Sequence, residues 1–246
     1  MTTFSEVKRW TRPLLDADAR LVLIGRNLVL RPVGHFIRGV YVDRTSNRLR
    51  SRLMFYIHPL FAPSNSEVSF LWSREQLPYR IDDKRFESGF LDLCQTGLAD
   101  LDQLETMDDF LKQAEAITSR SFGDVPISLF PLRHAEVLAA LGRFEQALSI
   151  LAPAMRGEET TANRILASAE AQLASKPRSL VAKDSIAHAT LRLQLVARLK
   201  PLLHLLEADD HAGVAALLRN HEHQDAKLWK VDHLWEPTPF PFEDGL

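Results

Sequence analysis

Arginine and histidine side chains are concentrated in one short stretch of this 246-residue chain. The candidate binding residues of that stretch, one aspartate among them, are His35, Arg38, Asp43, Arg44, Arg48, Arg50, Arg52 and His58. Guanidinium groups on one strand face can bind phosphate or carboxylate groups through two parallel hydrogen bonds. A neighbouring histidine could act as an acid or a base near neutral pH. One hypothesis is therefore an enzyme or binding protein with an Arg/His-lined pocket for a phosphorylated or carboxylated small molecule.

The same arginines also have a structural interpretation. Arg48, Arg50 and Arg52 alternate with apolar residues, as expected on the solvent-facing side of an antiparallel strand, and the acidic stretch 100–109 could pair with them. Arg38 differs, because it shares strand parity with apolar neighbours and must be paired if it points toward the core. We expect Asp43 or a helix carboxylate as the partner of Arg38.

A second group of chemically capable residues lies near the C-terminus, at His221, His223, Asp225 and His233. Imidazole and carboxylate groups suit zinc and related ions. On a helix, however, His221 and His223 would diverge by about 200°. We therefore expect no metal site and no cofactor, and we expect these residues to form a cluster on the surface.

No stretch carries a motif that dictates a reaction. The sequence lacks a G-x-S-x-G elbow, a G-x-x-x-x-G-K-[ST] phosphate loop and a G-x-G-x-x-G turn. Cys94 shares a helix face with Phe90 and Leu98, where a thiol is usually an inert apolar group. We therefore predict no catalytic residue, and the sequence favours a non-enzymatic role over an enzymatic one.

The hydrophobic pattern changes period near residue 80, which predicts an α+β fold. Apolar residues alternate over about 27–73, so we expect a small antiparallel sheet of three or four strands, packed by an N-terminal helix that ends near residue 16. In the run 49–57, the odd positions should face the core. The even positions, with Tyr56 and His58 after Arg52, should face solvent.

After residue 80 nearly all apolar residues recur at helical spacing, which predicts a mostly α-helical region. Thr3 with Glu6, and Thr106 with Asp109, have the spacing of helix N-terminal capping boxes. Separate helices are expected at 165–173 and from about 185 to 200, with Pro201 breaking or kinking the second. We predict three parts: an α+β part at 1–80, a helical part at 81–220 and a docked extended Pro/aromatic tail at 221–246, which could all form one domain.

Charge and composition indicate the cellular compartment and the classes of partner. Residues 1–52 hold eleven Lys/Arg against four Asp/Glu, whereas residues 82–109 hold two against nine. The single cysteine fits a reducing compartment, and no run approaches the roughly 18 apolar residues of a membrane span. We therefore expect a cytoplasmic protein with no membrane contact. Nucleic-acid binding is not expected, because Tyr56 is the one aromatic residue interleaved with the basic face.

Parts of the chain show two resemblances to known sequences. The segment 131–154, with Gly142 at a turn where φ can be positive, resembles one tetratricopeptide-type helical pair, a kind that usually serves as a protein-binding scaffold. The segments 35–50, 55–65 and 234–243 are similar to uncharacterised bacterial cytosolic proteins of no named family. That similarity implies a bacterial setting and no particular activity. Our leading hypothesis is a non-enzymatic cytosolic protein-interaction module, adaptor-like or inhibitor-like, with a protein partner.

Overall fold

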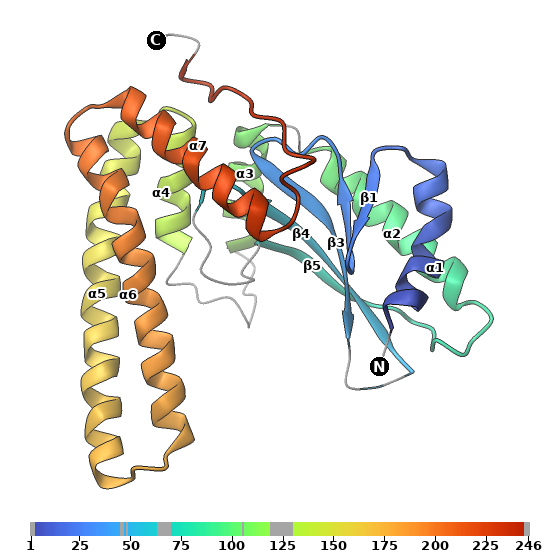
Figure 1. The fold of residues 1–246 in the computed structure, drawn as a ribbon, viewed down its shortest axis with the longest axis horizontal. Helices are drawn as coiled ribbons and strands as arrows, with labels where there is room; N and C mark the ends of the chain where they lie inside the picture. The colour runs from blue at the N-terminus through green and yellow to red at the C-terminus, as the bar shows by residue number, and fades with distance from the viewer. Residues whose placement is uncertain are drawn as a thin grey trace. The chain divides into compact units, whose positions relative to one another are not determined.

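The computed structural model describes residues 3–44, 47, 49–62, 70–104, 106–118 and 130–243, without the side chains of residues 44, 70–74, 113–118 and 130. Over these ranges the chain has an α+β fold, which confirms the prediction (Figure 1). The strands are β1 (Leu21–Ile24), β2 (Asn27–Leu30), β3 (Phe36–Arg44), β4 (Ser51–Pro59) and β5 (Phe70–Gln76). The helices are α1 (Phe4–Ala17), α2 (Phe86–Asp102), α3 (Met107–Thr118), α4 (Phe130–Ala140), α5 (Phe144–Ser175), α6 (Leu180–Glu207) and α7 (His211–Leu228).

Contacts divide the chain into two compact units that are not contiguous in sequence. Unit 1 contains residues 1–60, 68–117 and 222–238, and unit 2 contains residues 61–67, 118–221 and 239–246. Helix α7 contributes to both units, because the division falls between His221 and Glu222. The three-part division drawn from the sequence remains a prediction, except that residues 221–228 belong to α7 and are not extended.

The sheet of unit 1 is antiparallel throughout the described residues, in the order β1-β2-β3-β4-β5. Strand β1 was not expected from the sequence. It has only four residues and is joined to β2 by a tight turn, in which Gly25 adopts a φ of 59°. So short a run gives little period-two signal, although the glycine turn between two aliphatic runs is typical of a hairpin.

One face of the sheet packs on helices α1 and α2, as expected. Phe55 of β4 is fully buried, and a Cβ added at Gly97 of α2 would lie inside the space of its ring. Trp10 of α1 meets Phe86 and Phe90 of α2 at ring-centroid distances of 4.7 and 5.8 Å. Apolar packing of two helices on one face therefore holds this side of unit 1.

The opposite face was predicted to be solvent-exposed, and for half of β4 that prediction is wrong. Tyr56 and His58 are both buried, because the C-terminal turns of α7 and the segment after it cover them. The buried cluster on this side consists of Val29, Val33, Ile37, Tyr56, Leu60, Ala226 and Val231. This part of the sheet is therefore covered on both faces, and the second cover comes from residues far away in sequence.

Unit 2 contains a helical pair and a long hairpin. Helix α4 packs on α5 across the turn at Gly142, whose φ of 75° confirms the predicted positive value. Helix α5 then packs along α6 to form a two-helix hairpin, joined by a turn at Lys176–Ser179 (Figure 1).

Two helix ends in unit 2 differ from the prediction. The helix expected at 165–173 is the last third of α5, which passes through Pro153. Helix α6 continues through Pro201 to Glu207, so Pro201 does not break it, and the predicted alternative of a kink stays a prediction. Leu199 and Leu202 are fully buried on either side of Pro201. Their burial offsets the lost hydrogen bond, so the helix continues.

Candidate functional site

The structure places Arg38 at a helix end. Its Nη1 group donates hydrogen bonds to the carbonyl oxygens of Leu101 and Leu104, at 3.4 and 3.1 Å. These carbonyls lie at the end of α2 and just beyond it, where the helix leaves acceptors without intrahelical donors and carries partial negative charge. Arg38 therefore lies toward the helix-covered face, as its strand parity predicted, and it stabilises the C-terminus of α2.

The other predicted arginines lie in or next to the β3–β4 hairpin. The strand register sets Asp43 directly opposite Arg52, where opposite charges attract across an antiparallel pair. Arg50 is exposed in the turn that precedes β4. Arg44 pairs through its backbone with Ser51, but its side chain lies outside the described residues, as does Arg48.

His35, just before β3, forms a close contact with a buried carboxylate of α7. Its Nδ1 lies 2.6 Å from Oε1 of Glu222, and the Glu222 side chain is fully buried. His35 itself is 13% exposed, and its Nε2 lies 3.3 Å from the hydroxyl of Thr238. At 2.6 Å the two atoms are within hydrogen-bond distance, with the ring N–H as the donor and the carboxyl oxygen as the acceptor.

His58 of β4 forms the second imidazole–carboxylate pair. Its Nε2 lies 3.2 Å from Oδ2 of Asp225, and both side chains are almost completely buried. The indole ring of Trp229 packs over the His58 imidazole at 4.9 Å and over the Tyr56 ring at 5.7 Å. We call His35, His58, Glu222 and Asp225 the imidazole–carboxylate cluster.

This cluster corrects the expectation of a surface group near residue 221. Asp225 is buried against His58, and the Nδ1 atom of buried His221 lies 3.2 Å from the carbonyl oxygen of Phe61 within unit 2. His223 is exposed on another side of the helix. Over the described ranges, no three His, Cys, Asp or Glu side chains are grouped so that they could hold a metal ion.

Glu222 and Asp225 were missed as partners for the histidines, although a signal was present. Together with Ala226 and Trp229 they recur at i, i+3, i+4 and i+7, the spacing of one helix face. That spacing predicts a half-polar face, whose carboxylates need partners if the face is buried. The sequence does not indicate that His35 and His58 are those partners.

Tyr56 completes the buried surroundings of the cluster. A Cβ added at Gly39 would lie 2.5 Å from the Leu28 carbonyl oxygen and 3.1 Å from the Tyr56 hydroxyl, so the glycine makes room for the phenol. Burial raises the pKa of Tyr56 above its ordinary value of 10.0. The phenol therefore stays neutral, and its hydroxyl has no hydrogen-bond partner among the described residues.

A carboxylate on one ring nitrogen fixes the orientation and tautomer of an imidazole, in structural and in catalytic settings alike. For His35, whose Nδ1 meets Glu222, this leaves Nε2 beside the Thr238 hydroxyl. For His58 the carboxylate and the ring are both buried. Since each histidine precedes or belongs to a sheet strand and each carboxylate belongs to α7, the cluster acts as two polar cross-links inside unit 1.

A second feature that bears on function is the α5–α6 hairpin of unit 2. Arg192 and Glu158 form an ion pair of 2.5 Å between the two helices, and both side chains are nearly buried. A buried charged pair in a helix–helix seam is best known for fixing register. The Arg192–Glu158 ion pair separates two halves of the hairpin, which differ in the size of the side chains buried between the helices.

The half next to α4 is packed by large side chains. Its buried residues include Leu151, Met155, Leu195, Val196, Leu199, Leu202 and Leu206. In the distal half, between the ion pair and the turn, the buried residues are alanines: Ala162, Ala169, Ala182 and Ala189. Ile165, Leu166, Leu173 and Ile186 are only partly covered there.

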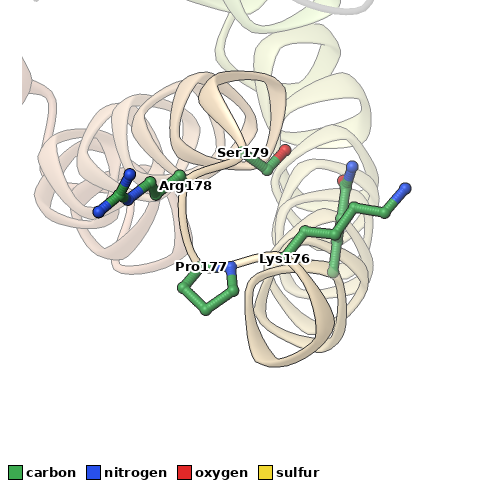
Figure 2. A pocket seen from close by; sticks show the side chains of 5 residues that line it. Lys176, Pro177, Arg178 and Ser179 are labelled. Atoms are coloured by element: carbon green, nitrogen blue, oxygen red, sulfur yellow. The ribbon is translucent and has the colours of Figure 1, made fainter.

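The hairpin ends in an exposed apolar and basic surface, which we call the hairpin tip: Lys176, Arg178, Leu180, Val181 and Lys183. Leu180 is 74% exposed and Val181 is 69% exposed. Beside them lies a shallow hollow of about 600 Å³, lined by Gln172 and the turn residues 176–179. Figure 2 shows Lys176 and Arg178 pointing outward on opposite sides of this turn.

The chain matches no protein-family model, no curated protein and no solved structure. None of the described helices is long and apolar enough to cross a membrane. Within the described part of the chain, the imidazole–carboxylate cluster and the hairpin tip are therefore the two features from which a function can be inferred.

Proposed function

We propose that this chain is a non-enzymatic protein-interaction module that binds a protein partner through the α5–α6 hairpin. The observation that carries the proposal is the exposure of two adjacent aliphatic side chains, Leu180 and Val181, at the hairpin tip. Exposed aliphatic residues scattered singly are ordinary, but a contiguous apolar surface with polar groups around it is typical of a docking site.

The packing of the distal half supports the same role. Two helices whose fully buried residues are alanines bury less apolar area than two helices packed by leucines, so they gain less stability from each other. Ile165, Leu173 and Ile186 remain partly open along this half. A partner seated on the distal half would bury these side chains and supply the missing packing.

The cluster in unit 1 supports a structural role better than a catalytic one. Its two carboxylates face two imidazoles, so its polar groups are directed toward each other inside unit 1. The pocket for an anionic small molecule stays a prediction. It is weakened because the carboxyl groups of Glu222 and Asp225 already lie against one ring nitrogen of His35 and of His58, which an anionic ligand would otherwise contact.

We further propose a cytoplasmic, bacterial setting. This setting is supported by the single, buried Cys94 and by the sequence resemblances, and burial raises the pKa of the Cys94 thiol above 9.0 so that it stays protonated. An adaptor or inhibitor would act there by occupying a surface of its partner.

The test is co-precipitation of full-length protein from native cytosol, with mass spectrometry of the recovered proteins. We expect one protein to be recovered with the wild type and with Leu228→Ser, but not with the double variant Leu180→Ser, Val181→Ser. Leu228 is the matched control, because it is an exposed leucine of unit 1. Equal recovery with all three proteins, or recovery of no protein, would contradict the proposal.

A further inference from the structure

We infer that the hairpin tip docks a protein surface that combines an apolar depression with carboxylate groups. This inference rests on the proposed function and adds the chemistry of the partner. Three features of the tip support it: the exposure of the two aliphatic residues, the charges around them and the lining of the neighbouring hollow.

The apolar part of the tip is compact and fixed in place. Leu180 and Val181 occupy the first two positions of α6, immediately after Ser179, whose hydroxyl accepts a hydrogen bond from the Ala182 amide at 3.2 Å. This cap holds the first turn of α6 in helical geometry. The two side chains are therefore presented on a capped helical turn, so the backbone that carries them is already folded before binding.

The charges around the aliphatic pair are mostly positive. From Glu170 to Asp184 the chain carries three Lys/Arg residues, and the two carboxylates of this stretch, Glu170 and Asp184, stand at its ends. Within the described residues, none of Lys176, Arg178 and Lys183 forms an ion pair. Two cations farther along α6 are already paired, Arg192 with Glu158 and Lys200 with Glu159. Unpaired cations around an apolar pair are complementary to carboxylates around an apolar depression.

The same surface fits a membrane less well. Helices that lie in a lipid interface present a broad apolar face, usually with Trp or Phe, whereas the tip offers one leucine and one valine. The hollow beside it is lined by the Gln172 side chain and the turn residues 176–179, which offer hydrogen-bonding groups. Such groups suit a polypeptide, whose backbone and side chains can pair with them.

The experiment places a photo-crosslinking benzophenone residue at position 180 of the full-length chain, with position 228 as the control. Irradiation is carried out in native cytosol and, separately, with vesicles of anionic phospholipid. The crosslinking is repeated with Lys176→Glu, Arg178→Glu, Lys183→Glu and with the control Lys227→Glu, Lys230→Glu. It is also repeated as the salt is raised from about 0.1 M to about 1 M, which shortens the screening length to about 3 Å.

We expect a defined protein adduct from position 180 and not from position 228, with acidic residues near the crosslinked peptide. The triple charge reversal should lower its yield at least about tenfold, because like charges then face each other, and high salt should lower it through screening. The control reversal should leave the yield unchanged.

Three outcomes would overturn the inference. A protein adduct that survives charge reversal and high salt would refute the acidic partner while leaving the interaction function intact. Adducts with lipid alone, or with a second copy of this chain alone, would refute an acidic protein as the occupant. If no adduct forms and co-precipitation also recovers no protein, the proposed function itself fails.

Discussion

The imidazole–carboxylate cluster joins residues that are very far apart in the chain. His35 and Glu222 are separated by 187 positions, and His58 and Asp225 by 167. Each pair crosses from the sheet to the C-terminal part of α7. Removing one member of such a pair leaves the other polar group buried against apolar surroundings, which costs more than the pair contributes.

The first prediction concerns the cost of removing one partner of a buried pair. Glu222→Ala should lower the free energy of unfolding by about 3–5 kcal/mol, because it leaves the mostly buried His35 without its carboxylate. The measurement is urea unfolding, with the slope checked for constancy.

The matched control is the exposed pair His204–Glu207, whose Nδ1 and Oε2 atoms lie 3.5 Å apart. Glu207→Ala should change stability by less than about 0.5 kcal/mol, because exposed pairs are screened by water and salt. Equal losses for the two variants would show that the Glu222 contact contributes no more than a surface pair.

The second prediction concerns pH. Hydrogen bonds from the Arg85 side chain and backbone lower the pKa of Asp83 from 3.8 to about 2. Because the folded-state pKa is the lower one, this interaction stabilises the fold above about pH 4, and the stabilisation is lost as the pH falls toward 2. Titration of the side-chain carbonyl carbon by NMR should give the low value directly.

Arg85→Ala should raise the pKa of Asp83 part of the way back to 3.8, since the backbone hydrogen bond remains. Asp109 is the control, because Thr106 lowers its pKa and Arg85 is not among the groups that do so. An unchanged Asp83 titration in Arg85→Ala would rule out the side chain as the cause.

Local polar contacts could be predicted from sequence, and distant ones could not. Thr3 and Glu6 form the predicted capping box at the start of α1, and Thr106 and Asp109 form the one at α3. Both depend on a spacing of three residues. The histidine–carboxylate contacts depend on which element covers the second face of the sheet, and no local pattern encodes that arrangement.

At the scale of elements, periodicity predicted the sheet and most helices, but not where helices continue. Proline signals a break because it removes one backbone donor and crowds the preceding turn, at a cost of about 3 kcal/mol. In α6 this cost is offset because Leu199 and Leu202 are fully buried. Whether burial offsets it depends on tertiary contacts, so α6 could not be traced past Pro201 from sequence.

The third prediction compares two glycines of unit 2. Gly142 has a φ of 75°, and a Cβ there would lie 2.6 Å from the Cβ of Phe242, so Gly142→Ala should destabilise by about 1–3 kcal/mol. Gly157 lies inside α5 with open space around it, so Gly157→Ala should stabilise by about 1 kcal/mol. Thermal unfolding of both variants checks the opposite signs, and a shift of the same sign in both would contradict the prediction.

At the scale of the whole molecule, each unit is completed by C-terminal residues. Residues 222–238 belong to unit 1, where Trp235 pairs with Val33 as an isolated parallel bridge. In unit 2, Phe240 is fully buried near Phe61 and Phe242, and Glu243 forms an ion pair with Arg219 at 2.6 Å. The proline and aromatic content of this segment predicted a packed tail, but no local signal divides it between two units.

The fourth prediction concerns local stability across unit 2. The distal half of the α5–α6 hairpin buries alanines, whereas the other half buries leucines, so the backbone amides of the distal half should open more often. Hydrogen exchange followed by mass spectrometry should show faster exchange in peptides within 163–188 than in peptides within 195–206. Equal protection of both halves would mean that the alanine seam is not the weaker part.

The separation in sequence between the histidines and their carboxylates also matters while the chain is being synthesised. At about 5–20 residues per second, His35 is added to the chain about 10–40 seconds before Glu222. During that interval, the sheet face that contains Ile37, Tyr56 and His58 lacks the helix that covers it in the finished protein. Newly made chains therefore expose an apolar face at the stage when chaperones meet them.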